Sequence, residues 1–444
     1  MDWSRSRCGL GHGAQGAPPD RVAGNPKGMR AMGSVTLLGR GRRKLLAGEA
    51  WIFRGDLGKS DAGPGELVPV LDQDGDVLGW ALHSTSSKLA LRMVTRSPEQ
   101  PNREFWARRV ERCLEARAGA GYLDALQPMA ACRLIGGDAD GLPGLVVDRY
   151  GDRLVLQCGT EAADKMRDFL LDLLLAGLAE RGIEIAGILD RSDAKVREHE
   201  NLDSRIEWLR GDASMEKLMV DEDGLTFAVD LGTGHKTGHY LDQRDNRRRA
   251  AVLVQDLGKC GFCKPEDARV LDVFSYDGLF GMLAAQAGAK RVLCLDQSAS
   301  AGERVLQNAQ ANGVADQVSF EKVNAMHDLG RRVDAGEEWD IVILDPPAFA
   351  RSKRELPGAK RGYGELFRRG FQLMPKGGFL VAASCSYNMK PEAFLDVLTK
   401  AARDAKVIAH LLDIHGASVD HPRRLDIPET DYLKCAFVRV EPKS

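Results

Sequence analysis

The C-terminal half of this chain alternates short apolar runs with segments of helical spacing, and this alternation constrains the fold more than any other feature. Strands that alternate with helices form parallel sheets, because each helix returns the chain to the same edge of the sheet. The predicted strands are residues 269–274, 291–296, 318–324, 340–344, 378–384, 407–414 and 432–440. No helix long enough for a crossover separates the last two strands. The sequence therefore predicts an α/β fold whose C-terminal part is a Rossmann-like, seven-stranded, doubly wound sheet with an antiparallel edge strand.

The residues before this sheet predict three further regions, since 444 residues are too many for one ordinary core. Residues 1–32 are Gly-rich, polar and aperiodic, and they predict a disordered leader that lacks the apolar core of a signal peptide. Residues 33–100 contain short β runs separated by turns and predict a small β-rich domain. Residues 101–232 predict a linker helix followed by a compact α+β module. The sheet domain then occupies residues 233–444.

The composition favours a globular protein and argues against a secreted or membrane-spanning one. With 43% hydrophobic and 28% charged residues, the chain resembles an ordinary globular protein. Its nine cysteines show no paired framework, which favours a reducing cytoplasm over secretion. The longest apolar run, residues 169–179, is interrupted by Asp172 and is too short to span a bilayer, so no membrane partner is expected. With a net charge of -2, any contact with nucleic acid must use a local basic surface.

The turn after the first strand of the sheet, Ser275 to Gly278, indicates a cofactor loop. Ligands of doubly wound sheets bind beyond the carboxyl ends of the strands, and Gly278 would let the backbone approach a ligand closely. The dinucleotide fingerprint GxGxxG is absent, which favours a cofactor without pyrophosphate, commonly S-adenosylmethionine. Asp296 would accept both ribose hydroxyls, and Asn324 would bind the adenine edge. The residues expected to contact the cofactor from these strand ends are Asp272, Phe274, Ser275, Tyr276, Gly278, Asp296, Gln297, Asn324, Asp345 and Pro346.

Two other strands end in residues that suit covalent attack on a pyrimidine ring: Asp345 in VILDPPAF and Cys385 in AASCSY. Carbon 5 of a pyrimidine is a poor nucleophile, and a thiolate that adds to carbon 6 turns the ring into an enamine that can attack a methyl group. Asp345, protonated or sharing a proton, would hydrogen-bond ring nitrogen 3. These two residues are the predicted catalytic pair. The sequence identifies neither the base that removes the carbon-5 proton nor the cation that would lower the pKa of the thiol.

Two alternatives use the same residues differently. In the first, an Asp-Pro-Pro-aromatic motif clamps an exocyclic amine for methylation. Here Ala348 follows the prolines directly and Phe349 comes one residue late, which weakens that reading. In the second, the chain is a non-catalytic RNA-binding assembly factor with a vestigial fold, and the intact Asp296, Asn324 and Asp345 argue against it. No metal site is predicted, because the CxxC of residues 260–263 lacks a second pair.

A basic segment with interleaved aromatic residues, 350–370, follows the Asp-Pro-Pro motif at the predicted catalytic rim. Its place favours contacts with RNA phosphates over a merely solvated helix face. The residues predicted to bind RNA are Arg351, Lys353, Arg354, Lys360 and Arg361. Residues 40–44 and 244–249 are weaker candidates of the same kind. Three histidines near the predicted site are interpreted as structural residues, namely His235, His239 and His327.

Several motifs together resemble the RlmI-type large-subunit rRNA methyltransferases: GHKTGHYLDQRDNRR, VLDVFSYDGLFG, VILDPPAFARSK, SCSY and DHPRRLDIPETDYLKCAFVRV. The GxKTGxYLDQR run is highly specific, and the resemblance covers residues 35–440. It implies a class I methyltransferase fold, a PUA domain that binds RNA in the β-rich region, and a central EEHEE domain in the α+β module. The chain departs from the family at Asn324, where many members have Asp, and in its leader, which has no counterpart.

This resemblance also implies an activity. It implies that S-adenosylmethionine methylates carbon 5 of a cytosine in 23S rRNA, with Cys385 as the nucleophile, and that Tyr240 and Gln243 line the cofactor pocket. The RNA would be naked rRNA or a large-subunit precursor, and the mixed sheet edge allows a homodimer. The family is broad, so the target base and the RNA class stay open at this point.

Overall fold

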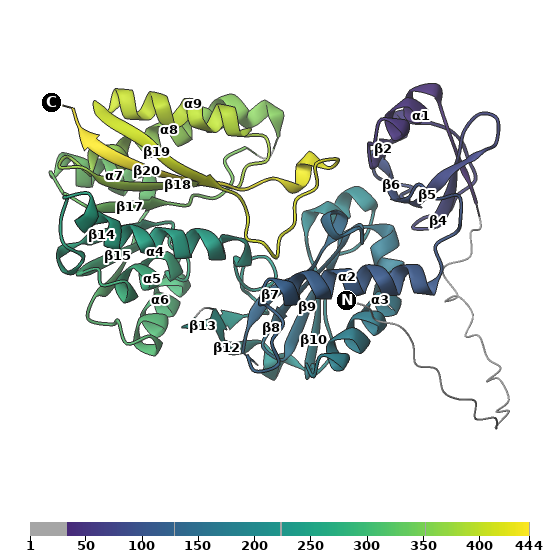
Figure 1. The fold of residues 1–444 in the computed structure, drawn as a ribbon, viewed down its shortest axis with the longest axis horizontal. Helices are drawn as coiled ribbons and strands as arrows, with labels where there is room; N and C mark the ends of the chain where they lie inside the picture. The colour runs from purple at the N-terminus through teal and green to yellow at the C-terminus, as the bar shows by residue number, and fades with distance from the viewer. Residues whose placement is uncertain (1–32, 128, 223, 351, 444) are drawn as a thin grey trace, which may run out of the picture.

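The computed structural model describes residues 33–443 apart from residues 128, 223 and 351. Figure 1 shows an N-terminal domain at one end, a central domain beside it and a larger C-terminal domain at the other end. The leader predicted at residues 1–32 lies outside the described residues. No helix in the described part of the chain is long and apolar enough to cross a membrane.

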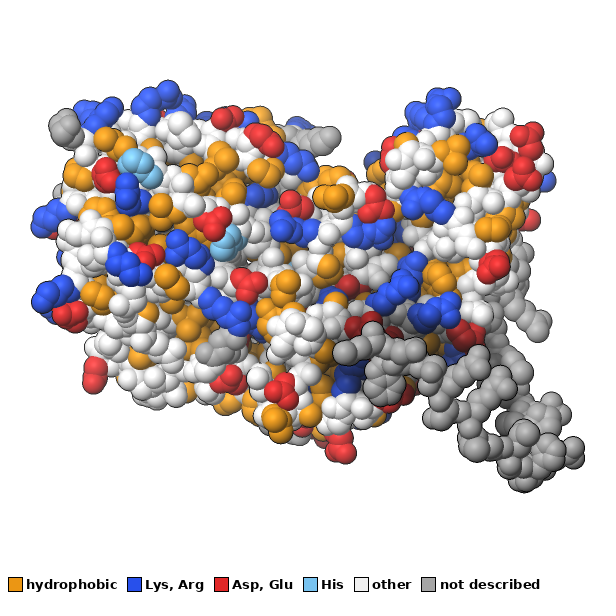
Figure 2. Space-filling view, viewed as in Figure 1, with side chains coloured by type: hydrophobic (Ala, Val, Ile, Leu, Met, Phe, Trp, Pro, Cys, Tyr) orange, Lys and Arg blue, Asp and Glu red, His pale blue; other side chains and the backbone are white. Residues whose placement is uncertain are grey.

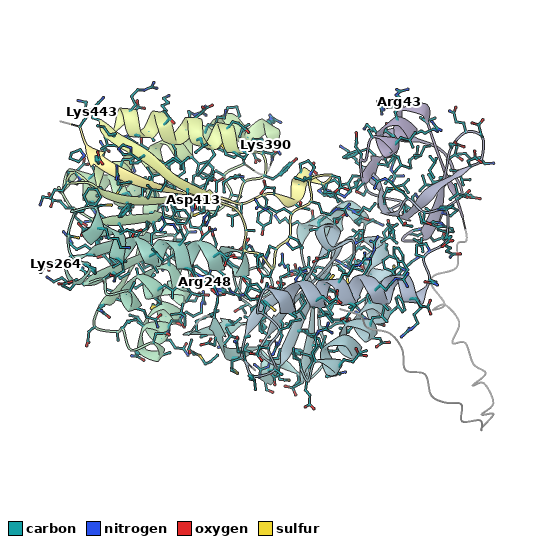
Figure 3. All side chains as sticks on the ribbon, in the orientation of Figure 1. Arg43, Arg248, Lys264, Lys390, Asp413 and Lys443 are labelled. Atoms are coloured by element: carbon teal, nitrogen blue, oxygen red, sulfur yellow. The ribbon has the colours of Figure 1, made fainter. Side chains whose placement is uncertain are left out.

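The N-terminal domain is a six-stranded sheet in the order β2-β6-β5-β4-β1-β3. Its elements are β1 (Val35–Leu37), α1 (Gly39–Leu46), β2 (Trp51–Phe53), β3 (Leu57–Ser60), β4 (Leu67–Leu71), β5 (Val77–His83) and β6 (Leu89–Thr95). The basic run at residues 40–44, a weaker candidate for RNA contacts, forms most of α1. Leu45 faces the core, and Lys44 pairs with the buried Asp56 at 3.0 Å. Figure 3 shows Arg43 on the outer side of this helix.

The central domain is a five-stranded sheet in the order β11-β10-β9-β8-β7, covered on one face by two helices. Its elements are α2 (Arg103–Gly119), β7 (Ala131–Gly136), β8 (Leu145–Tyr150), β9 (Arg153–Cys158), α3 (Glu161–Glu180), β10 (Gly187–Ser192) and β11 (Arg205–Arg210). Helix α2 begins at Asn102, whose side chain accepts the Phe105 N–H at 2.9 Å. The predicted α+β module with a preceding linker helix is therefore present.

A hairpin of β12 (Lys217–Glu222) and β13 (Leu225–Asp230) joins the central domain to the C-terminal domain. Its buried Val220 and Phe227 share one apolar cluster with the helices of the C-terminal domain. Helix α6 (Ala299–Ala311) holds the hairpin backbone, because the Asn308 side chain accepts the Ala228 N–H at 3.0 Å. The hairpin thus fixes the C-terminal sheet against the domain that precedes it.

The C-terminal domain confirms the predicted doubly wound sheet, in the order β16-β15-β14-β17-β18-β20-β19. Its strands are β14 (Arg269–Val273), β15 (Arg291–Asp296), β16 (Val318–Lys322), β17 (Ile341–Leu344), β18 (Gly378–Ser384), β19 (Val407–His415) and β20 (Lys434–Pro442). The other helices are α4 (Arg244–Lys259), α5 (Leu279–Gln286), α7 (Ala325–Asp334), α8 (Leu356–Gln372) and α9 (Pro391–Asp404). Helices α4 to α6 pack on one face, and α7 to α9 on the other. The reversed strand is β20, which lies antiparallel between β18 and the edge strand β19.

Candidate active site

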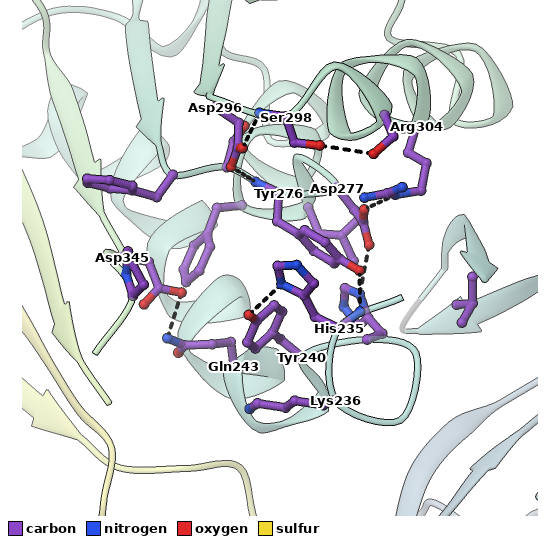
Figure 4. A pocket seen from close by; sticks show the side chains of 18 of the residues that line it. His235, Lys236, Tyr240, Gln243, Tyr276, Asp277, Asp296, Ser298, Arg304 and Asp345 are labelled. Carbon is purple, nitrogen blue, oxygen red and sulfur yellow. Dashed lines mark hydrogen bonds and ion pairs between the residues drawn. The ribbon is translucent and has the colours of Figure 1, made fainter. Parts of the chain in front are cut away.

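A cavity of about 1200 Å³ opens beyond the carboxyl ends of the parallel strands (Figure 4). These ends meet at one edge of the sheet, which brings residues far apart in sequence together. The predicted residues that line the cavity are Tyr240, Gln243, Phe274, Ser275, Tyr276, Asp296, Gln297, Asn324, Asp345, Pro346 and Cys385. The sequence analysis missed others that line it, including Lys236, Asp242, Ser298, Arg304 and Tyr432.

The loop after β14 holds an uncommon backbone conformation. Phe274 and Tyr276 have φ angles of 63° and 49°. Residues other than glycine rarely adopt such angles, and they do so most often where a loop is shaped to hold a ligand. The loop is tied to the end of β15, because the carboxylate of Asp296 accepts the N–H of Tyr276 at 3.1 Å and that of Ser298 at 2.9 Å. These two hydrogen bonds fix the Asp296 carboxylate in the wall of the cavity.

Two predicted cofactor residues, Asp272 and Gly278, do not line the cavity but lie beneath the loop. Asp272 accepts the N–H of Gly281 at 3.0 Å, and burial raises its pKa to about 7. Gly278 has a φ of 76°, and a Cβ there would stand 3.0 Å from the Val305 side chain. Glycine is thus required by the turn and by packing within the protein. This explanation replaces the expected close approach of a ligand.

Aromatic rings from two segments form one wall of the cavity (Figure 4). The His235 and Tyr276 rings stack at 4.8 Å, and Tyr240 meets Tyr276 edge-on at 5.2 Å. The Tyr240 hydroxyl and His235 Nδ1 are 2.9 Å apart. His239 also lines the cavity, but its ring is largely buried and its Nδ1 lies 3.1 Å from the Asp277 carboxylate. His235, interpreted as structural from the sequence, is thus part of the cavity wall.

Asn324 combines two roles at the end of the third strand. Its side chain accepts the N–H of His327 at 3.4 Å and begins α7, and the residue also lines the cavity. An amide at this position can present a donor and an acceptor to a ligand. The predicted contact with an adenine edge is therefore compatible with its place.

Asp345 follows β17 and accepts a hydrogen bond from Gln243 Nε2 at 3.0 Å (Figure 4). Burial raises its pKa to about 6, and the nearby Asp242 carboxylate adds to the rise. Burial opposes the ionisation of Asp242 as well, but Lys236 at 2.6 Å holds its pKa well below the usual range. Tyr432 donates to the same Asp242 oxygen at 2.6 Å. Asp345 is thus a carboxyl that gains and loses its proton close to neutral pH.

Cys385 follows β18 and lines the cavity beside Asp345. Burial raises the pKa of its thiol to about 11, and the Asp345 carboxylate contributes. This differs from the lowered pKa that the sequence-based mechanism called for. A buried ammonium lies next to it on β20, where Lys434 donates to the carbonyls of Ser386 at 2.7 Å and Tyr432 at 2.8 Å. Burial lowers the pKa of Lys434 to about 8, while Cys385 acts to raise it.

Of the five basic residues predicted to bind RNA, the structure describes the side chains of three. Arg354, Lys360 and Arg361 are exposed at the start of the α8 region. Arg351 and the side chain of Lys353 lie outside the described residues. The two exposed arginines and the lysine therefore remain candidates for phosphate contacts.

The arginine run at residues 244–249 is largely structural. Arg244 and Arg247 are each 2% exposed and pair with the buried Glu222 at 3.1 and 2.5 Å. Side chains this deeply buried cannot reach a phosphate, so the proposed RNA contact is wrong for these two. The ion pairs instead join α4 to the hairpin.

Family models match most of the chain. A model described as S-adenosylmethionine-dependent methyltransferase matches residues 190–426, more than half of the chain. The chain belongs to this family. A second model, described as a PUA-like domain, matches residues 35–96 and coincides with the N-terminal sheet. The protein is therefore a methyltransferase that uses S-adenosylmethionine, the cofactor predicted from the missing GxGxxG and the polar strand ends.

Curated relatives extend this membership over nearly the whole chain. The ribosomal RNA large subunit methyltransferase I of Aeromonas hydrophila is 36% identical over 415 residues, covering 92% of this chain and 100% of the relative. The protein of the same name from Tolumonas auensis is also 36% identical, with the same coverage. A solved structure of an S-adenosylmethionine-dependent methyltransferase from Streptococcus mutans matches with a TM-score of 0.72 at 21% identity. It covers 91% of this chain and 99% of that one, which shows that the two folds are alike.

The cavity of this methyltransferase fits its cofactor chemically. A fixed carboxylate, Asp296, suits the two hydroxyls of a ribose, and the Asn324 amide suits the edge of a base. The aromatic wall of His235, Tyr240 and Tyr276 suits a flat or cationic group. The cofactor supplies an electrophilic methyl group.

Proposed function

We propose that this methyltransferase forms 5-methylcytosine in large-subunit rRNA through a covalent bond between Cys385 and carbon 6 of the base. The observation that carries the proposal is the placement of Cys385 and Asp345 on neighbouring parallel strands, in the cavity that also contains Asp296. The names of the relatives, which are rRNA large subunit methyltransferases, support the RNA substrate. The PUA-like domain supports it as well.

The protonation states of the pair suggest how the thiol becomes reactive. In the free protein the thiol holds its proton, and Asp345 has lost most of its own at pH 7. Transfer of one proton from Cys385 toward Asp345 gives a thiolate and a carboxylic acid without any change in total charge. The thiolate adds to carbon 6, while the acid donates to ring nitrogen 3 and stabilises the adduct. After carbon 5 is methylated, a base removes its proton and the sulfur leaves.

Two ammonium groups act on this thiolate. Lys236 lowers the pKa of Cys385 by charge, although it is committed to Asp242. Among the described residues Lys434 forms no ion pair, because it donates to two backbone carbonyls, and Asp431 acts on it only through its charge. We infer that Lys434 is the positioning cation that stabilises negative charge at Cys385, the role that the sequence left unassigned.

Amine methylation is less well supported. In that reaction the aromatic residue after Asp-Pro-Pro would face the substrate. Phe349 instead packs against Tyr363, with ring centroids 4.6 Å apart, and does not line the cavity. Ala348 takes the lining position. The non-catalytic assembly factor would not retain a complete cofactor cavity.

Nucleoside mass spectrometry tests the proposal. Unmodified large-subunit rRNA is incubated with the pure protein and methyl-labelled S-adenosylmethionine, and the label is expected in 5-methylcytosine. Label in N-methylated cytosine would replace the cysteine adduct with the amine alternative. No label in naked rRNA, in assembled subunits or in tRNA, together with no cofactor binding by calorimetry, would favour the assembly factor.

Two finer expectations belong to the same proposal. We propose that the three exposed residues Arg354, Lys360 and Arg361 contact RNA phosphates at the rim of the active site.

We also propose a cytoplasmic homodimer that uses the edge strand β19, where Ile408, Leu411 and other apolar side chains are exposed. Light scattering with gel filtration tests the dimer, and a monomer at micromolar concentration would exclude it.

A further inference from the structure

A second, basic hollow lies where the three domains meet. Its volume is about 380 Å³, and its walls come from β6, from α2, from the turn at residues 137–141 and from the segment between β19 and β20. Four arginines line it: Arg96, Arg109, Arg112 and Arg424. Figure 2 shows Lys and Arg side chains gathered over α2 and the adjoining side of the N-terminal domain. We call this hollow the arginine crevice.

The central arginine of the crevice has no acidic partner. Arg109 donates to the backbone carbonyls of Val94 and Gly141 and lies over the Phe105 ring at 4.5 Å. Among the described residues, no carboxylate pairs with it. Burial lowers its pKa to about 10, and the charges of Arg424 and Arg112 lower it further. Arg109 therefore lies close to two like charges, and within the described residues no carboxylate is paired with it.

The carboxylates near the crevice already have arginine partners, and one of these partners is the crevice residue Arg424. Asp140 receives two hydrogen bonds from Arg117, at 2.8 and 2.6 Å, and Asp426 pairs with Arg424. Arg96 donates only to backbone carbonyls, those of Gly48 at 2.6 Å and Glu49 at 3.3 Å. Arg112 is exposed on α2, and no described residue is recorded as its partner. Arg109 and Arg112 thus have no carboxylate partner among the described residues. Arg96 forms no ion pair there either, although its charge helps to lower the pKa of Asp426. An outside anion could therefore be shared by these three side chains.

The crevice is also linked to the active site through one segment. Residues 416–433 carry Arg424 into the crevice and Tyr432 into the catalytic cavity. The segment is anchored midway, because the carboxylate of Asp420 accepts the Arg133 N–H at 2.9 Å and its carbonyl accepts from Arg117 at 2.9 Å. The segment 416–433 therefore contacts both a polyanion bound in the crevice and the catalytic cavity.

We propose that the arginine crevice binds a backbone phosphate of the RNA substrate, so that the N-terminal and catalytic domains hold one RNA molecule together. This inference rests on the RNA substrate proposed above. Guanidinium groups that are free of carboxylates bind phosphate oxygens through paired N–H donors. Three domains that each contribute to one anion site also fix their mutual orientation on the RNA. Such contacts position the RNA without reading its sequence.

The test uses the full-length protein with Arg96→Ala and Arg112→Ala combined. Arg96 contacts only backbone carbonyls and Arg112 is exposed, so we expect the double variant to keep the fold. Arg109 is left unchanged, because it joins two backbone segments. Binding to an unmodified large-subunit rRNA transcript is measured over a range of salt concentrations. We expect about tenfold weaker binding at low salt, and a slope of log affinity against log salt that is reduced by about one to two. Cofactor affinity and melting temperature should stay as in the wild type.

Two control variants sharpen the measurement. Arg96→Lys with Arg112→Lys keeps the charge and should retain most of the affinity and slope. Lys400→Ala with Arg403→Ala removes an equal charge from exposed positions near the end of α9. Because α9 runs back from the carboxyl end of β18, these residues lie at the opposite edge of the sheet and should have no effect.

The experiment distinguishes failure of the crevice assignment from failure of the proposed function. If the wild type binds and methylates the transcript but the double alanine variant matches it in affinity and slope, the crevice assignment is wrong. If inorganic phosphate at constant ionic strength stabilises the wild type but not the variant, and the RNA slope is unchanged, the site takes free phosphate and the RNA assignment is overturned. If the wild type neither binds nor methylates RNA, the proposed function fails and removes this inference with it.

Discussion

The cavity has a cofactor end around Asp296 and a catalytic end around Asp345 and Cys385. Backbone N–H groups fix the carboxylate at the cofactor end, whereas side chains such as Gln243 contact the carboxylate at the catalytic end. Asp296 accepts two N–H groups, one from the loop after β14 and one from the loop after its own strand, and stays part-exposed. Asp345 and Cys385 are part-exposed too, but burial raises the pKa of both, to about 6 and about 11. The Asp242 carboxylate adds to the first rise, and the Asp345 carboxylate adds to the second. The cofactor end is therefore preformed for binding, whereas the catalytic end has a carboxyl group whose protonation can change during the reaction.

The largest effect should come from Cys385→Ala. If Cys385 is the nucleophile, as proposed, turnover should fall by at least about a thousandfold, because the adduct that activates carbon 5 cannot form. Cofactor affinity, measured by calorimetry, should stay within about twofold, since the cofactor end is separate. Cys260→Ala, at an exposed cysteine, serves as the control and should be fully active. Substantial turnover by the Cys385 variant would remove the covalent mechanism.

The pH profile tests the shared proton. The reactive thiolate-acid form has the same proton count as the resting thiol-carboxylate form, which predominates above about pH 6. Below that pH the pair holds one proton too many, so kcat/KM should fall about tenfold per pH unit. Between about pH 6 and pH 8 it should be level.

Asp345→Asn should lower kcat by about a hundredfold and remove the acid limb of the profile. The measurement is kcat/KM for an rRNA fragment at a series of pH values. An acid limb that persists in the Asn variant would mean that another group titrates there.

Asp296→Ala tests the binding end. The loss of a charged acceptor that also fixes the Tyr276 loop should weaken cofactor binding between about tenfold and a hundredfold. RNA affinity should not change. Asp316→Ala, at an exposed carboxylate, is the matched control. Equal cofactor affinity in the Asp296→Ala and Asp316→Ala variants would mean that Asp296 does not contribute to cofactor binding.

The smallest effect is expected from Lys434→Met, which keeps the length of the side chain and removes its charge. At pH 7 kcat/KM should fall by about tenfold, a loss typical of one removed charge. Because the pKa of Lys434 is about 8, the wild type should also lose activity above that pH, and the Met variant should not. Lys400→Met, at an exposed lysine of α9, is the control. An alkaline limb that survives in the Met variant would assign it to another residue.

Much of the fold and of the cofactor end follows from local sequence. Each strand of the C-terminal sheet was predicted within about two residues, because apolar runs between turns and helices are a local signal. The positions of Asp296, Asp345 and Cys385 followed from topology, since parallel strands end at one edge. Helix α1 was missed, because a short basic run gives little apolar periodicity.

Other features were decided only by tertiary structure, because they depend on partners distant in the chain. The runs at 244–249 and 350–370 look alike as sequence, yet Glu222 buries Arg244 and Arg247 while Arg354 and Arg361 remain exposed. The raised pKa of Cys385 depends on burial and on a carboxylate forty residues away on the neighbouring strand. The arginine crevice joins residues 96, 109, 112 and 424, which no local pattern connects. Sequence thus determined which chemical groups stand at the ends of the strands, and packing decided which of them carry an uncompensated charge or a mobile proton.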